Sequence, residues 1–231
     1  MKNIALAIVI GGAALAVQSP AFAQAGPPPP PQLSHPGATA FTNEYNTKVL
    51  LGLQNQPVAA YSAAKKVAGC VAKRTKDDAG ALVGGTMSKD VNFAGLTGAL
   101  MNKHKVCVTQ DAVGVPMVYI NDALAEELLT RQPKALQDRA ALSDAAAAKS
   151  FYGAGSDVTM DTLGRCLAAY SPGLAYRVLV TGAGTTGETQ ALATLYAQTP
   201  ECGVPAAPNG IPAVEQRGAV AAGLYHWTHR G

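Results

Sequence analysis

The chain has 231 residues, of which 48% are hydrophobic, 14% are charged and only 6% are aromatic. Its 18 lysines and arginines outnumber its 15 aspartates and glutamates and give a formal net charge of +3. So small and scattered an excess does not indicate nucleic acid or an anionic membrane as a partner. The densest basic group, Lys65-Lys66 with Lys73-Arg74 and Lys76, has helical spacing and is typical of a solvated helix face.

Residues 1–23 have the pattern of a secretory signal peptide. Lys2 supplies the positive start, residues 4–17 form the apolar core, and Ala21-Phe22-Ala23 is a small-x-small cleavage site. The apolar core is shorter than the roughly 20 residues that a membrane-spanning helix needs. We therefore expect cleavage after Ala23 and a periplasmic or secreted protein that does not span a membrane. Without Lys2 its net charge falls from +3 to +2.

A proline run follows the expected cleavage site. Pro27 to Pro31 lack amide donors and favour an extended, hydrated backbone. We interpret residues 24–38 as a disordered tether between the signal peptide and the folded part of the chain.

From residue 39 onward the apolar residues recur at helical intervals. The series are Phe41, Tyr45, Val49 and Leu53; Val58, Tyr61, Ala64, Val67 and Val71; and Met160, Leu163, Leu167 and Tyr170. Asn121 is a candidate N-cap for a helix with Leu124 and Leu128, and Pro172 fits the first position of another helix. Strict alternation is scarce and alanine dominates, so we predict an all-α fold.

Two parts of the chain match at a shift of 96 residues. Cys70 and Gly114-Val115-Pro116-Met117-Val118 superpose on Cys166 and Gly210-Ile211-Pro212-Ala213-Val214, whereas Cys107 needs a shift of 95 to reach Cys202. We interpret the match as two tandem repeats of about four short helices each. Residues 39–132 would hold an N-terminal helix and repeat 1, residues 133–156 a linker with a helix-favouring alanine run, and residues 157–231 repeat 2.

The four cysteines are interpreted as two structural disulfides. An exported chain meets an oxidising environment, which favours disulfides. The sequence has no C-x-x-C pair of the kind that binds zinc. Four cysteines allow three pairings. We favour Cys70–Cys107 with Cys166–Cys202, because only this pairing treats both repeats alike and staples each one separately.

Several strings resemble a group of exported alphaproteobacterial proteins, found among sphingomonads, that carry duplicated cysteine-containing helical repeats and have no established activity. The matching strings are residues 69–74 (GCVAKR), 79–82 (AGAL), 123–128 (ALAEEL) and 217–225 (RGAVAAGLY). The resemblance implies a helical repeat fold and supplies no catalytic residue. The second repeat has Ala169-Tyr170 where the first has Lys73-Arg74, so a role that depends on these charges would not be shared.

A glycine-rich stretch offers the most specific chemical motif. Gly182, Gly184 and Gly187 follow an apolar run and spell G-x-G-x-x-G, with Glu201 close to where an acid that binds ribose would fall. The approach to Glu201 contains Pro200 and is no second strand, and an exported chain lies away from nicotinamide cofactors. The glycines also suit a helix C-cap, and Thr185-x-x-Glu188 suits a capping box. We therefore expect an interhelical turn and assign no cofactor.

Other polar residues give weak signals for a site. His226 and His229 could face one metal from a helix, but no third ligand lies nearby, and His35 and His104 have no acid–base partner in sequence. Glu126 and Glu127 point about 100° apart on a helix and are expected to face solvent. Ser156-Asp157 resembles a helix cap. We therefore assign no catalytic, cofactor-binding or metal-ligating residue.

These patterns predict a non-enzymatic binding or structural module of the cell envelope. Its partner would be an unknown protein or small molecule, bound in the groove between the two repeats, and would not be a nucleic acid. The alternative is an envelope hydrolase whose active site is assembled from residues distant in sequence.

Overall fold

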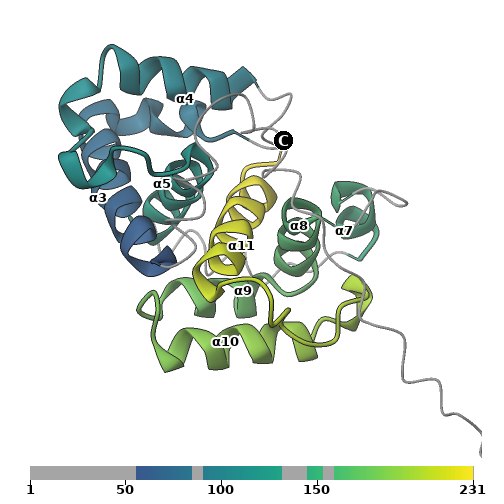
Figure 1. Cartoon of the computed structure of the whole chain (residues 1–231). Helices are drawn as coiled ribbons and strands as arrows, with labels where there is room; N and C mark the ends of the chain where they lie inside the picture. Colours follow the sequence, from purple (N-terminus) through teal and green to yellow (C-terminus); the bar gives the residue numbers. More distant parts are fainter. Residues whose placement is uncertain (1–55, 85–90, 132–144, 153–158, 231) are drawn as a thin grey trace, which may run out of the picture. The chain divides into compact units, whose positions relative to one another are not determined.

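The computed structural model describes residues 56–84, 91–131, 145–152 and 159–230, all within one compact unit, Leu33–Gly231 (Figure 1). The expected signal peptide (1–23), the tether (24–38) and the expected N-terminal helical series from Phe41 to Leu53 lie outside the described residues. Among the described residues every regular element is helical and none is a strand, so the all-α prediction is confirmed.

The elements run in chain order as α-helices joined by short 3₁₀ segments. The N-terminal group is α3 (Pro57–Thr75), η1 (Lys76–Leu82), α4 (Val91–Met101), η2 (Lys105–Cys107), η3 (Gln110–Ala112) and α5 (Met117–Arg131). After α7 (Ala145–Tyr152), the C-terminal group is α8 (Met160–Tyr170), α9 (Pro172–Leu179), α10 (Thr186–Ala197), η4 (Pro200–Cys202) and α11 (Ala213–Thr228). No helix in these ranges is long and apolar enough to cross a membrane.

Helix α11 is the centre of the core. It lies between α5 and α8, while α3 packs on the other side of α5 (Figure 1). Small residues allow this burial, because from Gln216 to Tyr225 every residue of α11 is buried. A helix that is buried on all sides has no polar face, so its sequence shows little amphipathic pattern.

The contact between α8 and α11 depends on glycine. A Cβ added at Gly223 would lie 2.5 Å from the carbonyl oxygen of Gly164, and a Cβ added at Gly164 would clash with the backbone of Ala219. Backbone cannot move aside as a flexible side chain can, so these two positions require the absence of a side chain.

We expect Gly223→Ala to lower the free energy of unfolding by at least about 1–3 kcal/mol, because the two helices must separate. Gly98→Ala is the matched control. Gly98 is exposed in α4 with nothing within 4 Å of an added Cβ, and alanine there should raise stability by about 0.5–1 kcal/mol. Urea unfolding followed by circular dichroism measures both changes. A gain in stability from Gly223→Ala would contradict this account of the α8–α11 contact.

Several helices begin at the residues that the sequence indicates. Pro172 occupies the first turn of α9, and the alanine run at residues 145–148 opens α7. Helix α8 begins after Thr159, which forms a capping box with Thr162, whereas the cap expected at residues 156–157 lies outside the described residues.

One local prediction is wrong, because Asn121 is not an N-cap. It lies inside α5, where its side chain accepts a hydrogen bond from the amide of Gly84 at 2.8 Å and donates to the carbonyl of Gly84.

Two disulfides pin the helices. Cys70 of α3 joins Cys107 of η2, and Cys166 of α8 joins Cys202 of η4, which is the pairing favoured from the sequence. The bonded cysteines are 37 and 36 residues apart, so each bond should contribute about 2–4 kcal/mol by restricting the unfolded chain.

Candidate functional site

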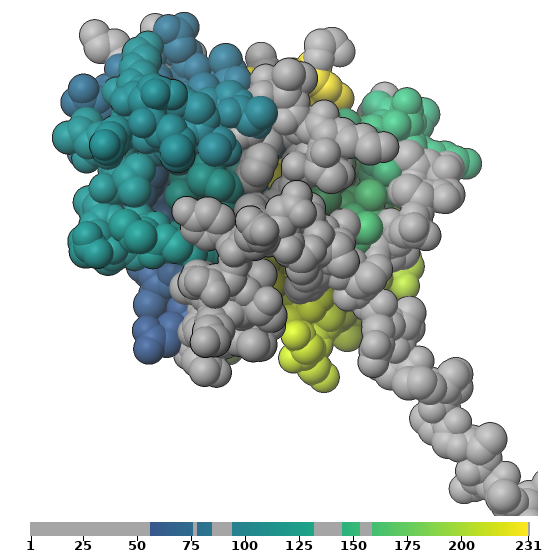
Figure 2. All heavy atoms as spheres, turned by 45° about the horizontal axis from the view of Figure 1, so that its top comes forward, coloured from purple at the N-terminus to yellow at the C-terminus, as the bar shows by residue number. Residues whose placement is uncertain are grey.

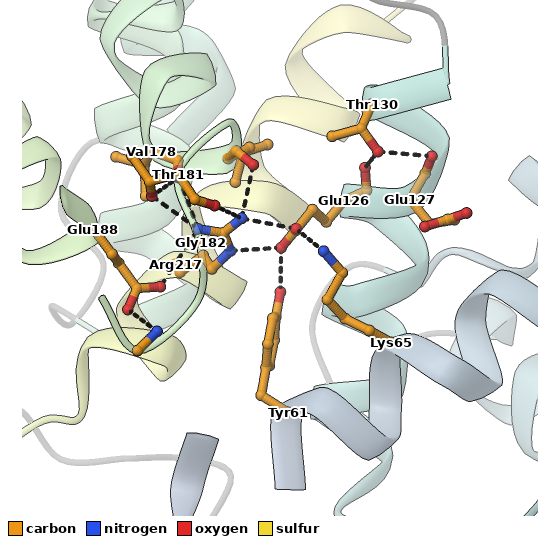
Figure 3. Close-up of polar contacts among 12 residues, drawn as sticks. Tyr61, Lys65, Glu126, Glu127, Thr130, Val178, Thr181, Gly182, Glu188 and Arg217 are labelled. Atoms are coloured by element: carbon orange, nitrogen blue, oxygen red, sulfur yellow. Dashed lines mark hydrogen bonds and ion pairs between the residues drawn. The ribbon is translucent and has the colours of Figure 1, made fainter. Parts of the chain in front are cut away.

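A buried ion pair joins α5 to α11. The side chains of Glu126 and Arg217 are 0% and 1% exposed. The guanidinium donates from Nε to Oε2 at 2.7 Å and from Nη2 to Oε1 at 2.8 Å (Figure 3). This two-pronged geometry is the strongest form of arginine–carboxylate contact.

Arg217 also closes the C-terminal end of α9. Its Nη1 donates to the carbonyl of Val178 at 2.7 Å, and its Nη2 donates to the carbonyls of Leu179 and Thr181 at 2.7 and 3.1 Å. Carbonyls in the last turn of a helix have no partner within the helix and carry its negative dipole end. The guanidinium therefore connects α11, which carries it, to α5 through the ion pair with Glu126 and to the end of α9 through hydrogen bonds.

Two residues of α3 complete the coordination of Glu126. The Tyr61 hydroxyl donates to Oε2 at 2.7 Å, and Lys65 Nζ donates to Oε1 at 2.6 Å (Figure 3). Burial alone would raise the pKa of Glu126, but the hydrogen bonds and charge of Arg217, followed by those of Lys65, hold that pKa below its usual value. Glu126 is therefore an ionised carboxylate inside the core. Burial, and then the charge of Glu126, raise the pKa of Tyr61 well above its usual value.

The glycine-rich stretch forms the turn between α9 and α10. Gly184 has φ of +75°, and Thr185 caps α10 by accepting from the amide of Glu188. Glu188 reaches back to accept from the amide of Gly184 at 2.8 Å, while its other oxygen lies 3.5 Å from Arg217. The apolar run before these glycines ends helix α9 and is no strand, so the turn lacks the context of a dinucleotide site.

Asp122 is a second carboxyl group in the core. It is 6% exposed and accepts one hydrogen bond, at 3.3 Å, from the side-chain amide of Asn121. Burial raises its pKa to about 8, and the nearby charges of Asp161 and Glu215 act in the same direction. Asp122 is therefore mostly protonated at neutral pH.

An open groove of about 550 Å³ lies along α3. Its lining is Lys65, Lys66, Gly69, Cys70, Lys73, Arg74 and Glu127. All these residues belong to α3 and α5, so this groove is not the expected one between the two repeats.

Two cations of the groove remain available. Lys65 contacts Glu126, and Lys66 contacts Asp111 at 2.6 Å. Lys73 and Arg74 are exposed and contact no carboxylate within the described ranges. The groove can therefore attract an anionic group, whereas the Arg217–Glu126 pair is sealed from solvent.

The histidines considered as candidate metal ligands or acid–base groups have separate surroundings in the structure. His226 Nε2 lies 2.9 Å from the carbonyl oxygen of Gly84, and His229 Nδ1 lies 2.8 Å from that of Tyr225. His104 is buried, and burial, followed by the charge of Lys103, lowers its pKa. His35 lies outside the described residues. Within the described ranges no three side chains of metal-ligating type gather into a group.

Sequence reasoning missed the ion pair. The sequence pattern predicts a solvent-facing Glu126 and indicates no partner for Arg217, yet both side chains are buried. The available signal was the setting of Arg217, since the helix that follows it, from Gly218 to Gly223, contains only small apolar residues. A charged side chain directly before such an apolar stretch is expected to be buried with it and to need a partner in the core.

Comparison with known proteins adds no relative: no family model, curated protein or solved structure matches this chain. The chemistry of its own residues is the basis for assigning a function.

Proposed function

We propose that this protein is a non-enzymatic binding module of the cell envelope and that it holds an anionic partner in the groove on α3. The observation that carries the proposal is the pair Lys73 and Arg74, two exposed cations without a carboxylate partner in the described ranges, on the helix that Cys70–Cys107 fastens. A fixed cationic surface attracts an anion with little loss of conformational freedom.

An envelope location is part of the proposal. The signal-peptide pattern of residues 1–23 supports export, and two disulfides suit an oxidising compartment. Membership of the exported sphingomonad-type group is likewise proposed on the strings that resemble it.

We also propose that the chain consists of two tandem units. Helix α3 is bonded to η2 and packs on α5, and α8 is bonded to η4 and packs on α11. Tyr119 donates to Glu215, 96 residues further on, at 2.7 Å, which supports a pairing of equivalent positions across α5 and α11. In this scheme the Arg217–Glu126 pair locks the units together.

Only the first unit would carry the binding surface. The positions that match Lys73 and Arg74 are Ala169, which is fully buried, and Tyr170, whose ring lies 5.9 Å from that of Tyr152 of α7. Helix α7 packs against α8, and its Tyr152 contacts the position that matches Arg74. The second unit therefore supports the first and does not duplicate it.

Charge reversal tests the proposal. Fluorescence anisotropy of the purified, disulfide-bonded protein should show saturable binding of labelled dextran sulfate and none of uncharged dextran. Lys73→Glu with Arg74→Glu should weaken this binding roughly tenfold or more, because two charge-assisted contacts become repulsive. Added salt should weaken the wild-type binding as well.

The matched control is Lys149→Glu with Arg177→Glu, which changes the net charge equally at exposed positions of α7 and α9. Equal losses from both variants would show attraction by net charge alone and would contradict a site on α3. The hydrolase alternative predicts turnover of chromogenic esters, glycosides or phosphate esters. Turnover that survives repurification of the protein would overturn the non-enzymatic assignment.

A further inference from the structure

Exposed apolar side chains are concentrated in one short segment. Of the large hydrophobic side chains that are exposed among the described residues, four lie between residues 101 and 113: Met101 (71%), Val106 (69%), Val108 (37%) and Val113 (66%). The segment runs from the end of α4 through η2 and η3, and in Figure 2 it lies, in teal, on the outside at the left of the view. We call residues 101–113 the apolar segment.

Basic residues interleave with these apolar ones. Lys103 and Lys105 are exposed and contact no carboxylate in the described parts of the chain, whereas Asp111, the one acidic residue of the segment, is paired with Lys66. The segment therefore presents a net positive charge beside exposed methionine and valine.

The apolar segment adjoins the cationic groove. The Cys70–Cys107 disulfide links α3 to η2, and Lys66 of the groove reaches Asp111 of η3. Arg74 is close enough to help lower the pKa of His104. These contacts place Lys66, Lys73, Arg74, Lys103 and Lys105 around one surface. The net charge of the whole chain hides this surface, because its cations come from separate parts of the sequence.

We propose that the anionic partner is a phospholipid bilayer, with the lysines and Arg74 contacting lipid phosphates and the apolar segment entering the headgroup region. This inference rests on the proposed function and names the partner of the same surface. Cations beside protruding apolar side chains are the usual features of a protein surface that lies on an anionic membrane.

The composition of the surface favours a lipid over a protein partner. Protein interfaces are enriched in aromatic residues, methionine and arginine and depleted in lysine. The apolar segment contains Met101 but no arginine, tryptophan, tyrosine or phenylalanine, its other exposed apolar residues are valines, and it has two lysines. Long lysine side chains can reach phosphates while their methylene groups lie along apolar surface. Because the disulfide already holds the segment in place, binding would not require it to fold.

Vesicle co-sedimentation tests the inference. The purified protein should pellet with phosphatidylcholine vesicles that contain phosphatidylglycerol, and much less with pure phosphatidylcholine. The triple replacement Met101→Ser, Val106→Ser and Val113→Ser should weaken binding to the anionic vesicles roughly tenfold or more. Each apolar side chain of this size that leaves water should raise the affinity severalfold or more. Val180→Ser, at a valine that is 59% exposed beyond α9, is the control and should leave binding unchanged.

The two proposals fail in different ways. If dextran sulfate binds at Lys73 and Arg74 but the vesicles do not pellet the protein, the bilayer is the wrong partner and the anion site remains. If neither probe binds, both proposals are wrong. If the triple replacement leaves vesicle binding unchanged, the apolar segment does not enter the headgroup region and this part of the inference is wrong. A partner protein captured through Met101 and Val106, without any vesicle binding, would replace the lipid. Unchanged thermal unfolding of each variant confirms that it folds.

Discussion

Arg217→Met is expected to lower the free energy of unfolding by about 3–5 kcal/mol. The replacement removes the bidentate partner of Glu126 and leaves a carboxylate that is 0% exposed with only Lys65 to balance its charge. It also removes the Arg217 donor from the carbonyl of Leu179 at the end of α9, whereas the carbonyl of Val178 keeps its hydrogen bond from the Thr181 hydroxyl. Urea unfolding at neutral pH measures the change.

A double-mutant cycle separates the ion pair from the loss of packing. Arg217→Met with Glu126→Gln should be less destabilising than the sum of the two single changes, by at least about 1–2 kcal/mol, because the charge that needs a partner is gone. Arg131→Met removes the partly exposed pair with Glu127 and should cost at most about 1 kcal/mol. A cost at Arg217 as small as that at Arg131, or strictly additive single changes, would contradict the role of the pair.

Asp122→Asn is expected to stabilise the protein at neutral pH, by an amount on the order of 4 kcal/mol. The folded chain holds the proton of Asp122 up to a pKa of about 8, whereas the unfolded chain releases it near 3.8. Between these values folding must take up a proton. The wild-type contribution is therefore fully present below about pH 4 and is lost as the pH rises to about 8. Asparagine is neutral throughout and avoids this loss.

The measurement is the difference in unfolding free energy between the variant and the wild type across this pH window. The difference should be smallest near pH 4 and should grow steadily toward pH 8. Asp111→Asn, at an exposed carboxylate paired with Lys66, is the control and should show no such growth. A constant difference for Asp122→Asn would mean that Asp122 is ionised in the folded chain.

Much of the local structure could be predicted because it depends on neighbours in sequence. Apolar residues at intervals of three and four mark the buried side of α3, and Tyr61, Val67 and Val71 are indeed fully buried. Pro172 opens α9, and the stretch from Gly184 to Glu188 forms the turn and cap that begin α10. Steric and capping preferences act over one helical turn, so single residues can indicate them.

Predictions failed where a residue has a partner far away in the chain. Asn121 is a good N-cap residue by type, but α5 begins at Met117 and the side chain of Asn121 instead bonds to the backbone of Gly84. Distant parts of the chain also decide which of Glu126 and Glu127 is buried. Helical geometry requires them to face different directions, and only the packing of α3 and α11 against α5 decides which one is buried.

The sequence alone determined that the described chain is helical and indicated which cysteines are paired, because these follow from periodicity and from the match between two parts of the chain. The tertiary structure decided which charged side chains are buried and which residues they pair with. Arg217 and Glu126 are 91 residues apart and meet only because α11, with small residues on every side, packs closely between α5 and α8. An alanine-rich helix has no single apolar face to point toward its neighbours, so its partners are chosen by close packing in three dimensions.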